Sequence, residues 1–571
     1  MLDLVIKGGL VVDGTGSEPV RADVAVEAGR IVAVGHVDES AAQTFEAGGL
    51  VISPGFVDPH THYDAQLFWD PLATPSSWHG VTTVIGGNCG FTLAPLRERD
   101  ADYTRRMMAQ VEGMPLAALE QGVPWNWESF GEYLDGFEGR LAVNAGFMVG
   151  HSALRRYALG DDFARTATEE ELSQLTRLLH ESLGAGGLGL STSRSTTHVD
   201  GDGAPVPSRW ASEEELLALC DVVALHDGTS LELITEGCIG RFSDQESEFL
   251  AEMSRRANRA INWNVLAVGA ADGERAEHQL GPSRRAREVG GRVVALTMPI
   301  FADQNMSFLT FCAMWLLPGW REVLDVEVSE RIRRLRDPAV RSRMLEQAAG
   351  ANLSRFADFA TYRIGDVFSE VNEPYRNRLV NEIAAERGED PFTTIVDIAA
   401  ADDLRTVLWP LPTADSAEDW ELRRRLWDEP DVMLGGSDAG AHLDRMLGSV
   451  YPTRFLGDVL RGRRLVSLQE AVHLMTDVPA QLFGLNDRGR LGPGYVADLV
   501  AFDPEAVDAQ PTRSAHDLPG ESKRLLAEAV GVEGVFVSGR AVVRNGVHTG
   551  DLPGQVLRSG RQAKGTQVRK D

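Results

Sequence analysis

Lysine is almost absent from this sequence. Of its 571 residues only Lys7, Lys523, Lys564 and Lys570 are lysines, and arginine supplies most of the basic charge. No lysine occurs between Lys7 and Lys523. Any catalytic device that needs a lysine side chain is therefore excluded from the middle of the chain.

Cysteine is equally scarce, and long apolar runs are missing. The four cysteines, Cys89, Cys220, Cys238 and Cys312, are widely scattered, which is typical of reduced thiols rather than of a disulfide framework. No apolar stretch approaches the roughly 20 residues that span a bilayer, and the first residues lack the pattern of a secretory signal. We therefore expect a cytoplasmic protein that does not act in a membrane.

Positive charge is also in deficit. The formal net charge of −28 argues against binding to nucleic acid or to an anionic membrane. With 43% apolar and 25% charged residues the composition is that of an ordinary soluble globular protein. We expect the partner to be a small-molecule substrate, and the composition leaves a homo-oligomer open.

The two ends of the chain share one pattern. Residues 1–52 and 481–552 read as short apolar strands separated by turn residues. We predict that both ends build one small β-sandwich domain. Two independent β modules are the alternative, but each of them would bury little apolar surface.

Between these ends, short buried strands alternate with amphipathic helices. Eight candidate strands begin at Val51, Thr82, Leu141, Leu188, Ser230, Ala260, Arg292 and Val432. Eight such repeats favour a closed (β/α)₈ barrel over residues 53–480, rather than an open doubly wound sheet. Two stretches interrupt the alternation, near residues 95–135 and 300–430, and we interpret them as insertions. Residues 553–571 are polar and basic, and we expect a flexible tail.

The first barrel strand leads into a His-x-His pair. Residues two apart on a strand point to the same side, so His60 and His62 can converge on one point. Two neutral imidazoles at a strand end suit Zn²⁺ or a similar ion. For an isolated pair, two unremarkable loop histidines are the better interpretation, so the case depends on the other strand ends.

Polar residues follow several of those other strands. They are Cys89 in Gly-Gly-Asn-Cys-Gly, His151 in Gly-His-Ser, Ser193 and Arg194 in Ser-Thr-Ser-Arg, and Asp438 and His442 in Gly-Gly-Ser-Asp-Ala-Gly-Ala-His. In a (β/α)₈ barrel the carboxyl ends of the strands carry the chemistry. All of these side chains are therefore candidates for one site.

Four motifs together resemble the amidohydrolase superfamily, and within it the N-acyl-D-amino-acid deacylase (D-aminoacylase) branch. They are residues 54–64 with His-x-His, residues 79–90 with Cys89, residues 435–440 with Asp438, and residues 489–500 near the second β-rich end. The resemblance covers nearly the whole chain. It implies a barrel beside a small β domain and a metal-dependent hydrolase acting on amide bonds.

The resemblance also implies roles for single residues. His60, His62 and Cys89 would be metal ligands, and Asp438 would be both a ligand and the general base. These roles are chemically reasonable, because Zn²⁺ polarises a carbonyl and activates water, a carboxylate can shuttle the proton, and thiolate is a good zinc ligand. For Cys89 alone a small buried hydrophobic residue would be the usual interpretation.

The sequence departs from the family pattern in two ways. The carbamylated lysine that bridges two metals in many amidohydrolases has no candidate here. The histidines that this branch brings from the fifth and sixth strands are missing too, and Glu236, Cys238 or Asn264 are the residues nearby that could replace them. We therefore expect one zinc ion, and the second metal site stays open.

The remaining candidates concern the substrate. His151 could polarise the carbonyl or could be a satisfied buried histidine. Arg194 could pair with a substrate carboxylate or form a structural salt bridge. Ser193 and His442 are placed near the same face as further substrate contacts.

We predict hydrolysis of a linear amide, most specifically of an N-acyl-D-amino acid to a carboxylate and a free amino acid. Two alternatives stay open. One is hydrolysis of another amide, a cyclic imide, a lactone or a carbamate on the same scaffold. The other is an inactive ligand-binding homologue.

Overall fold

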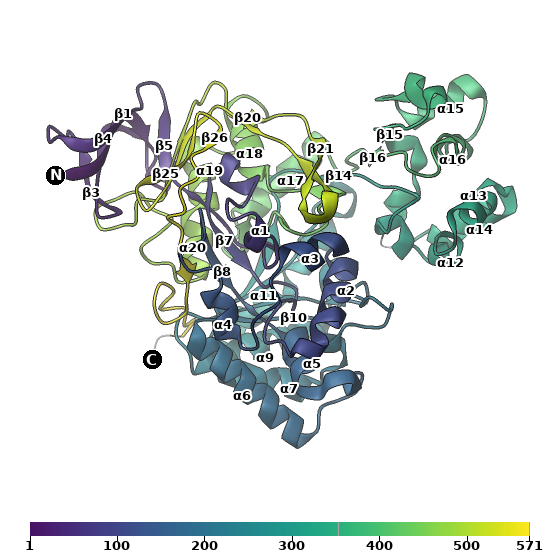
Figure 1. The fold of residues 1–571 in the computed structure, drawn as a ribbon, viewed down its shortest axis with the longest axis horizontal. Helices are drawn as coiled ribbons and strands as arrows, with labels where there is room; N and C mark the ends of the chain where they lie inside the picture. The colour runs from purple at the N-terminus through teal and green to yellow at the C-terminus, as the bar shows by residue number, and fades with distance from the viewer. Residues whose placement is uncertain (352, 570–571) are drawn as a thin grey trace. The chain divides into compact units, whose positions relative to one another are not determined.

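The computed structural model describes residues 1–351 and 353–569, which divide into two compact units (Figure 1). Residues 1–302 together with the chain from 416 onward form the first unit, and residues 303–415 form the second. No helix among the described residues is both long and apolar enough to cross a lipid bilayer. All four cysteines are buried, and none of them forms a disulfide.

A closed barrel of parallel strands forms the centre of the first unit. Its strands are β6 (Phe56–Asp58), β7 (Val81–Gly86), β8 (Asn144–Phe147) with β9 (Val149–Gly150), β10 (Gly189–Ser193), β11 (Ser230–Ile234), β12 (Ile261–Trp263), β13 (Val293–Thr297) and β17 (Val432–Leu434). Neighbouring strands pair in parallel throughout. The third strand is split at Met148: β8 bonds to β7, and β9 bonds to β10.

The barrel closes just beyond the ends of its first and last strands. Thr61 and Ala439 form a parallel bridge. The His62 amide donates to the Ala439 carbonyl (2.7 Å), and the Asp438 amide donates to the His60 carbonyl (3.1 Å). The predicted (β/α)₈ barrel is therefore present, and its closure brings His-x-His next to Asp438.

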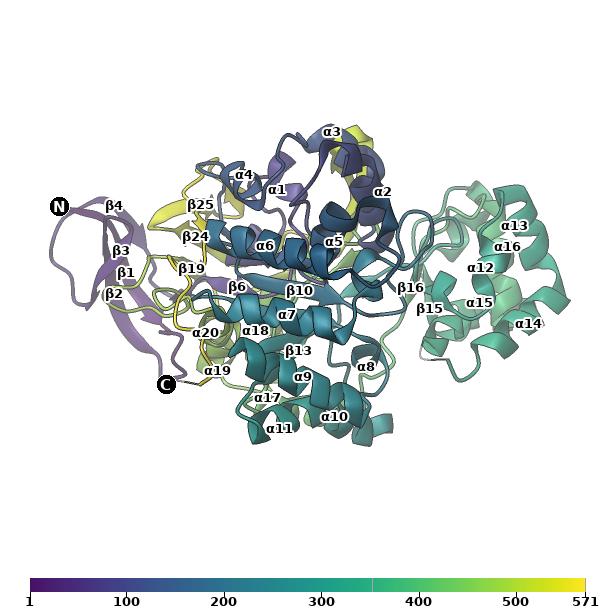
Figure 2. The same cartoon turned by 90° about the horizontal axis from the view of Figure 1, so that it is seen from below.

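Helices cover the outside of the barrel, and Figure 2 shows α6, α7 and α9 in series beside its strands. The covering helices include α4 (Phe130–Asp135), α5 (His151–Leu159), α6 (Glu169–Ala185), α7 (Glu213–Ala224), α9 (Asp244–Ala257), α11 (Gly281–Glu288), α17 (Ala417–Trp427), α18 (Tyr451–Leu460) and α19 (Leu468–Met475). In α6 the buried residues Leu175, Leu179 and Leu183 recur every fourth position, so one face packs inward. Thr168 and Glu171 form a reciprocal capping box at its start.

Strands from both chain ends join in one nine-stranded sheet. The strands are β1 (Leu2–Val11), β2 (Val20–Glu27), β3 (Arg30–Gly35), β4 (Ala41–Glu46) and β5 (Val51–Pro54) from the first end, with β19 (Leu499–Phe502), β24 (Val532–Val537), β25 (Arg540–Arg544) and β26 (Val547–His548) from the second. The prediction of one β domain from both ends is confirmed in this respect.

The start of the first barrel strand needs correction. Residues Val51–Pro54 do not belong to the barrel, because β5 pairs with β19 and β1 of the nine-stranded sheet. The chain changes sheets at Gly55, and the barrel strand begins at Phe56. A Cβ at Gly55 would lie 2.1 Å from Thr82 Oγ1, so only glycine fits at this crossing.

Asp498 connects the β sheet to the barrel, and it lies in the 489–500 motif. Its carboxylate accepts hydrogen bonds from Asn144 Nδ2 on β8 (2.9 Å) and from the Ser538 amide (2.8 Å). It also lies 3.2 Å from Nε of Arg488, whose side chain is 2% exposed. The motif therefore has a structural role at this junction.

The predicted flexible tail is wrong for residues 553–569. Val556 and Leu557 are buried and form β27 (Val556–Leu557), which pairs in parallel with β8. Arg558 is largely buried and contacts Asp135 and Glu138. The tail packs because these apolar residues lie beside the split third strand of the barrel. Lys570 and Asp571 fall outside the described residues.

The second unit, residues 303–415, has its own core and falls in the stretch interpreted as an insertion. Its helices are α12 (Trp320–Leu324), α13 (Val328–Arg336), α14 (Pro338–Ala348), α15 (Val380–Arg387) and α16 (Pro391–Ala401), with β15 (Tyr362–Ile364) antiparallel to β16 (Leu408–Pro410). The rings of Trp320, Phe359 and Phe392 pack against one another at its centre.

Candidate metal centre

His60 and His62 are both buried, at 2% and 1% exposure, at the carboxyl end of the barrel. Their backbone is held by the hydrogen bonds that close the barrel, so the two rings have little freedom. The ring centroids lie 5.3 Å apart. Neither Nδ1 atom has a hydrogen-bond partner, and each Nε2 faces Asp438 Oδ1, at 3.6 Å from His60 and 3.2 Å from His62.

Cys89 reaches the same point from the loop after β7. Its φ of 55° is left-handed, and Gly87 and Gly90 on either side also have positive φ, so the loop turns tightly. Cys89 Sγ lies 3.7 Å from His60 Nε2. One ligand atom each from His60, His62 and Cys89 falls within a span of 4.8 Å, as a shared metal ion requires.

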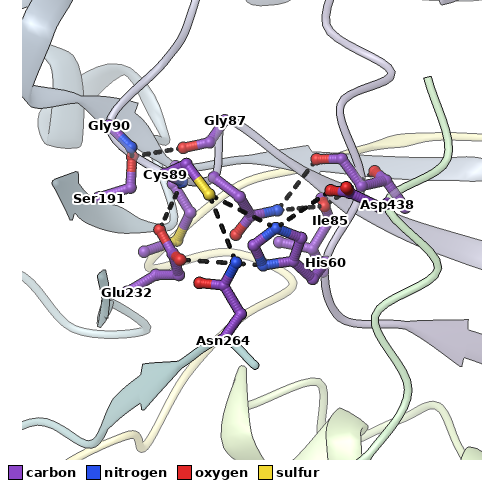
Figure 3. Close-up of polar contacts among 12 residues, drawn as sticks. His60, Ile85, Gly87, Cys89, Gly90, Ser191, Glu232, Asn264 and Asp438 are labelled. Atoms are coloured by element: carbon purple, nitrogen blue, oxygen red, sulfur yellow. Dashed lines mark hydrogen bonds and ion pairs between the residues drawn. The ribbon is translucent and has the colours of Figure 1, made fainter. Parts of the chain in front are cut away.

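The spacing of these atoms fits a common ion. Two nitrogen or oxygen ligands at about 2.1 Å from a tetrahedral zinc lie about 3.4 Å apart, and a nitrogen and a sulfur lie about 3.6 Å apart. The separations in the cluster are 3.2 and 3.6 Å for the nitrogen–oxygen pairs and 3.7 Å for the nitrogen–sulfur pair. The residues present therefore suit a divalent metal. Figure 3 shows His60, Cys89 and Asp438 pointing toward one another.

Two buried glutamates complete the surroundings, and the sequence reasoning missed both. Glu232, at the middle of β11, accepts a hydrogen bond from the Cys89 amide at Oε2 (2.7 Å) and lies 3.8 Å from His60 Nδ1 at Oε1 (Figure 3). Glu112 lies 3.5 Å from His62 Nε2. A single acid inside the apolar strand Ser230–Ile234 was the available signal for Glu232. No strand end pointed to Glu112.

Several acidic groups lie close together in the cluster, and a cation among them would stabilise their ionised forms. Burial raises the pKa of the Cys89 thiol well above its usual range, and Glu232, Glu112 and Asp438 add to the effect. Burial likewise raises the pKa of Glu232 to about 7 and that of Glu112 well above its ordinary value. For Asp438, burial is outweighed by the contacts with His60 and His62, which hold its pKa well below the usual range. A divalent ion would offset this concentration of buried acids.

Of Glu236, Cys238 and Asn264, only Asn264 reaches the cluster. Asn264 lies against Cys89 Sγ (3.5 Å), and with its amide nitrogen turned toward Glu232 it donates to Oε1 (3.0 Å). Glu236 instead accepts from Thr196, and Cys238 bonds with Thr235. Those two residues come after the end of β11, whereas Glu232 lies within it. Of the three possible replacements, Glu236 and Cys238 therefore have other partners.

His151 does not have the catalytic geometry expected for it. Its Nδ1 bonds to Thr192 Oγ1 (2.9 Å) and its Nε2 to Glu215 Oε1 (2.8 Å). Glu215 is in turn paired with the buried Arg155. Both ring nitrogens are used inside the protein, so none is left to polarise a substrate carbonyl, and the satisfied buried histidine is the correct interpretation.

The three residues predicted to contact substrate, Arg194, Ser193 and His442, lie in different surroundings. Arg194 lies over the Phe249 ring and lines, together with Glu236, a cavity of about 300 Å³ to which none of the cluster residues contributes. Its pairing with a substrate carboxylate stays a prediction. Ser193 Oγ bonds to His198 Nδ1 (2.8 Å). His442 lies beside the cluster, and burial lowers its pKa to about 4.

Comparisons with known proteins place this geometry in context. A model described as the amidohydrolase family matches residues 43–543. D-aminoacylase from Alcaligenes xylosoxydans xylosoxydans is 29% identical over 568 residues, which cover 97% of each chain. N-acyl-D-aspartate deacylase from the same organism is 29% identical and covers 98% of this chain and 95% of its own.

A solved structure shows the same fold. N-acyl-D-glutamate deacylase from Bordetella bronchiseptica, complexed with zinc and a phosphonate inhibitor that mimics the tetrahedral intermediate, matches with a TM-score of 0.65. The two sequences are 26% identical, and the match covers 98% of this chain and 99% of the other.

Proposed function

The chain belongs to the amidohydrolase family, in its D-aminoacylase branch, and from this premise we propose that it is a zinc-dependent deacylase of N-acyl-D-amino acids. The coarser part of this statement, a metal-dependent hydrolase acting on C–N bonds, follows from the family and its relatives. The substrate class is the new part. It is supported by nearly full-length similarity to relatives named for N-acyl-D-amino acids.

The observation that carries the proposal is the convergence of His60, His62, Cys89 and Asp438 at ligand-to-ligand distances. We assign these four residues as the metal ligands. The ion, when bound, polarises the scissile carbonyl and makes water acidic enough to lose a proton near neutral pH. The rest of the chemistry falls to the protein's own side chains.

Asp438 is the general base in this proposal. Its Oδ1 faces the two histidines, and its other oxygen is free to take the proton of the attacking water and return it to the leaving amine. The contacts with His60 and His62 lower its pKa, so Asp438 is ionised, the form that can accept a proton. The Asp438 side chain is also 29% exposed, against 3% for His60 and 1% for His62, so substrate reaches the cluster from the Asp438 side.

The surroundings support a single ion. Both oxygens of Glu232 face hydrogen-bond donors, the Cys89 amide and the Asn264 side chain. Asn264 is neutral, and an amide is a poor zinc ligand. A second ion would therefore lack the nitrogen ligands that the first one has.

The test is a substrate panel run on zinc-loaded protein of known metal content. We expect turnover of N-acyl-D-amino acids, little turnover of the L enantiomers, and loss of activity in Asp438→Asn with zinc retained. Hydrolysis of cyclic imides, lactones or carbamates without any N-acyl-D-amino acid turnover would refute the substrate class. Absence of bound metal and of turnover would favour an inactive binding protein.

A further inference from the structure

Glu112 is brought to the metal centre by the segment between β7 and β8. It follows α2 (Ala101–Val111), and its amide donates to Met108 at the last turn of that helix. The Glu112 carbonyl accepts from the amide of His442, four residues after Asp438. The next residue, Gly113, has φ +58°, and a Cβ there would lie 2.8 Å from His442 Nδ1. The backbone at Glu112 is thus fixed against the loop that carries Asp438.

Glu112 is buried, at 3% exposure for the residue. Among the described residues none donates a hydrogen bond to its carboxylate, whose pKa is raised by burial and by neighbouring carboxylates alone. Its Oε2 lies 3.5 Å from His62 Nε2, on which Asp438 Oδ1 also converges at 3.2 Å. The other charged groups that act on it are carboxylates, those of Asp438, Asp64 and Glu232. Among the described residues, no basic side chain other than His62 pairs with it.

Two carboxylates, the buried one of Glu112 and the partly exposed one of Asp438, therefore face one imidazole nitrogen. A ring nitrogen has one proton or one lone pair, so it cannot bond to both carboxylates. A cation positioned in front of that nitrogen is in reach of both and removes the cost of burying them unpaired. The 3.5 Å separation is close to the spacing of two ligands on one zinc ion, about 3.4 Å.

We propose that Glu112 is a further ligand of the divalent ion, giving a site of two nitrogens, one sulfur and carboxylate oxygens from both Asp438 and Glu112. Zinc accepts five ligands as well as four, so one of the two carboxylates must leave the ion when the attacking water binds. In this arrangement a segment outside the barrel strands supplies part of the first coordination sphere, so metal binding also fixes the loop after α2. The inference rests on the metal dependence and does not require the substrate class to be correct.

Glu112→Gln tests this directly, because the amide keeps the size of the side chain and removes the charge. The matched control is Glu120→Gln, at an exposed position of the neighbouring helix α3 (Leu116–Gly122). Zinc affinity is measured on the full-length protein by competition with a chromophoric chelator, and coordination is read from the visible spectrum of the cobalt(II)-loaded protein. Neither readout needs a substrate.

We expect Glu112→Gln to bind zinc at least about tenfold more weakly than wild type and to give stronger cobalt absorption, as a lower coordination number requires. Glu112→Asp, which keeps the charge on a shorter side chain, should fall between the two, and Glu120→Gln should match wild type. An unchanged affinity and cobalt spectrum in Glu112→Gln would overturn the proposal. So would a metal-free Glu112→Gln protein that melts below metal-free wild type, because Glu112 would then be needed for folding.

Discussion

Glu232 offers the sharpest single test of how the centre is organised. Its carboxylate holds the Cys89 amide at 2.7 Å, accepts from the turned Asn264 amide at 3.0 Å, and faces His60 Nδ1 at 3.8 Å. It therefore contacts two of the assigned ligands, Cys89 and His60, at atoms other than those that face the ion. We predict that Glu232→Gln weakens zinc binding by positioning Cys89 and His60 less well.

The magnitude follows from the contacts that are lost. Glutamine keeps one acceptor oxygen but turns an N–H₂ group toward a second donor, so one charge-assisted hydrogen bond is removed. Such a bond contributes about 1.5–3 kcal/mol. That range corresponds to roughly a 10- to 100-fold loss of affinity, which is also the usual effect of removing a partner of a metal ligand.

The assay is zinc competition on Glu232→Gln beside Glu236→Gln. Glu236 is a matched control because it lies four residues away and its carboxylate bonds to Thr196 outside the cluster. We expect the loss only in Glu232→Gln. Equal zinc affinity in both variants would refute the reasoning, since Glu232 would then have no part in holding the ligands.

Three further predictions concern residues outside the cluster. His151→Gln should lower the melting temperature, because it removes a partner of the buried Glu215. The zinc content of the folded chain should stay unchanged. Loss of zinc without a change in the melting temperature would contradict this prediction. Asp498→Ala should lower the unfolding free energy by about 3 kcal/mol, which is the lower end of the range for breaking a buried ion pair. The lower end applies because Arg488 keeps its contact with Asp487. Denaturant titration measures the loss, and a loss near zero would contradict this prediction. Leu557→Ala should cost about 2–5 kcal/mol, because the side chain is fully buried on β27; an unchanged unfolding transition would show that the tail does not contribute to packing.

Much of the fold could be predicted because its signals are local. Apolar strands alternating with capped helices identify a parallel barrel, and the turn-rich pattern at both ends identifies a β domain. The exception at Val51–Pro54 has a physical cause. The mostly apolar residues from Val51 to Asp58 belong to two different sheets, and the chain passes from one to the other at Gly55. This crossing depends on the close approach of Gly55 to Thr82, which is not its neighbour in sequence.

The site could be predicted only in part, because strand ends were the guide. That guide found His60, His62, Cys89 and Asp438, which the structure brings together. It also selected His151, although the nitrogens of that ring are taken by Thr192 and Glu215, partners that no local pattern shows.

The missed glutamates show two different limits. Glu232 lies within β11, and a lone acid in a buried strand is visible in the sequence once such positions are examined. Glu112 lies after a helix in an insertion, and its place beside His62 depends on the backbone contact with His442. Only the folded chain reveals that contact.

The central claim is that one divalent ion is held by His60, His62, Cys89 and Asp438. An anomalous difference map recorded at the zinc edge, from crystals of the zinc-loaded protein, tests it most directly. The account predicts a single strong peak within bonding distance of both histidine Nε2 atoms, the Cys89 sulfur and the Asp438 carboxylate. A map without a peak there, or with the zinc peak away from these four residues, would contradict it.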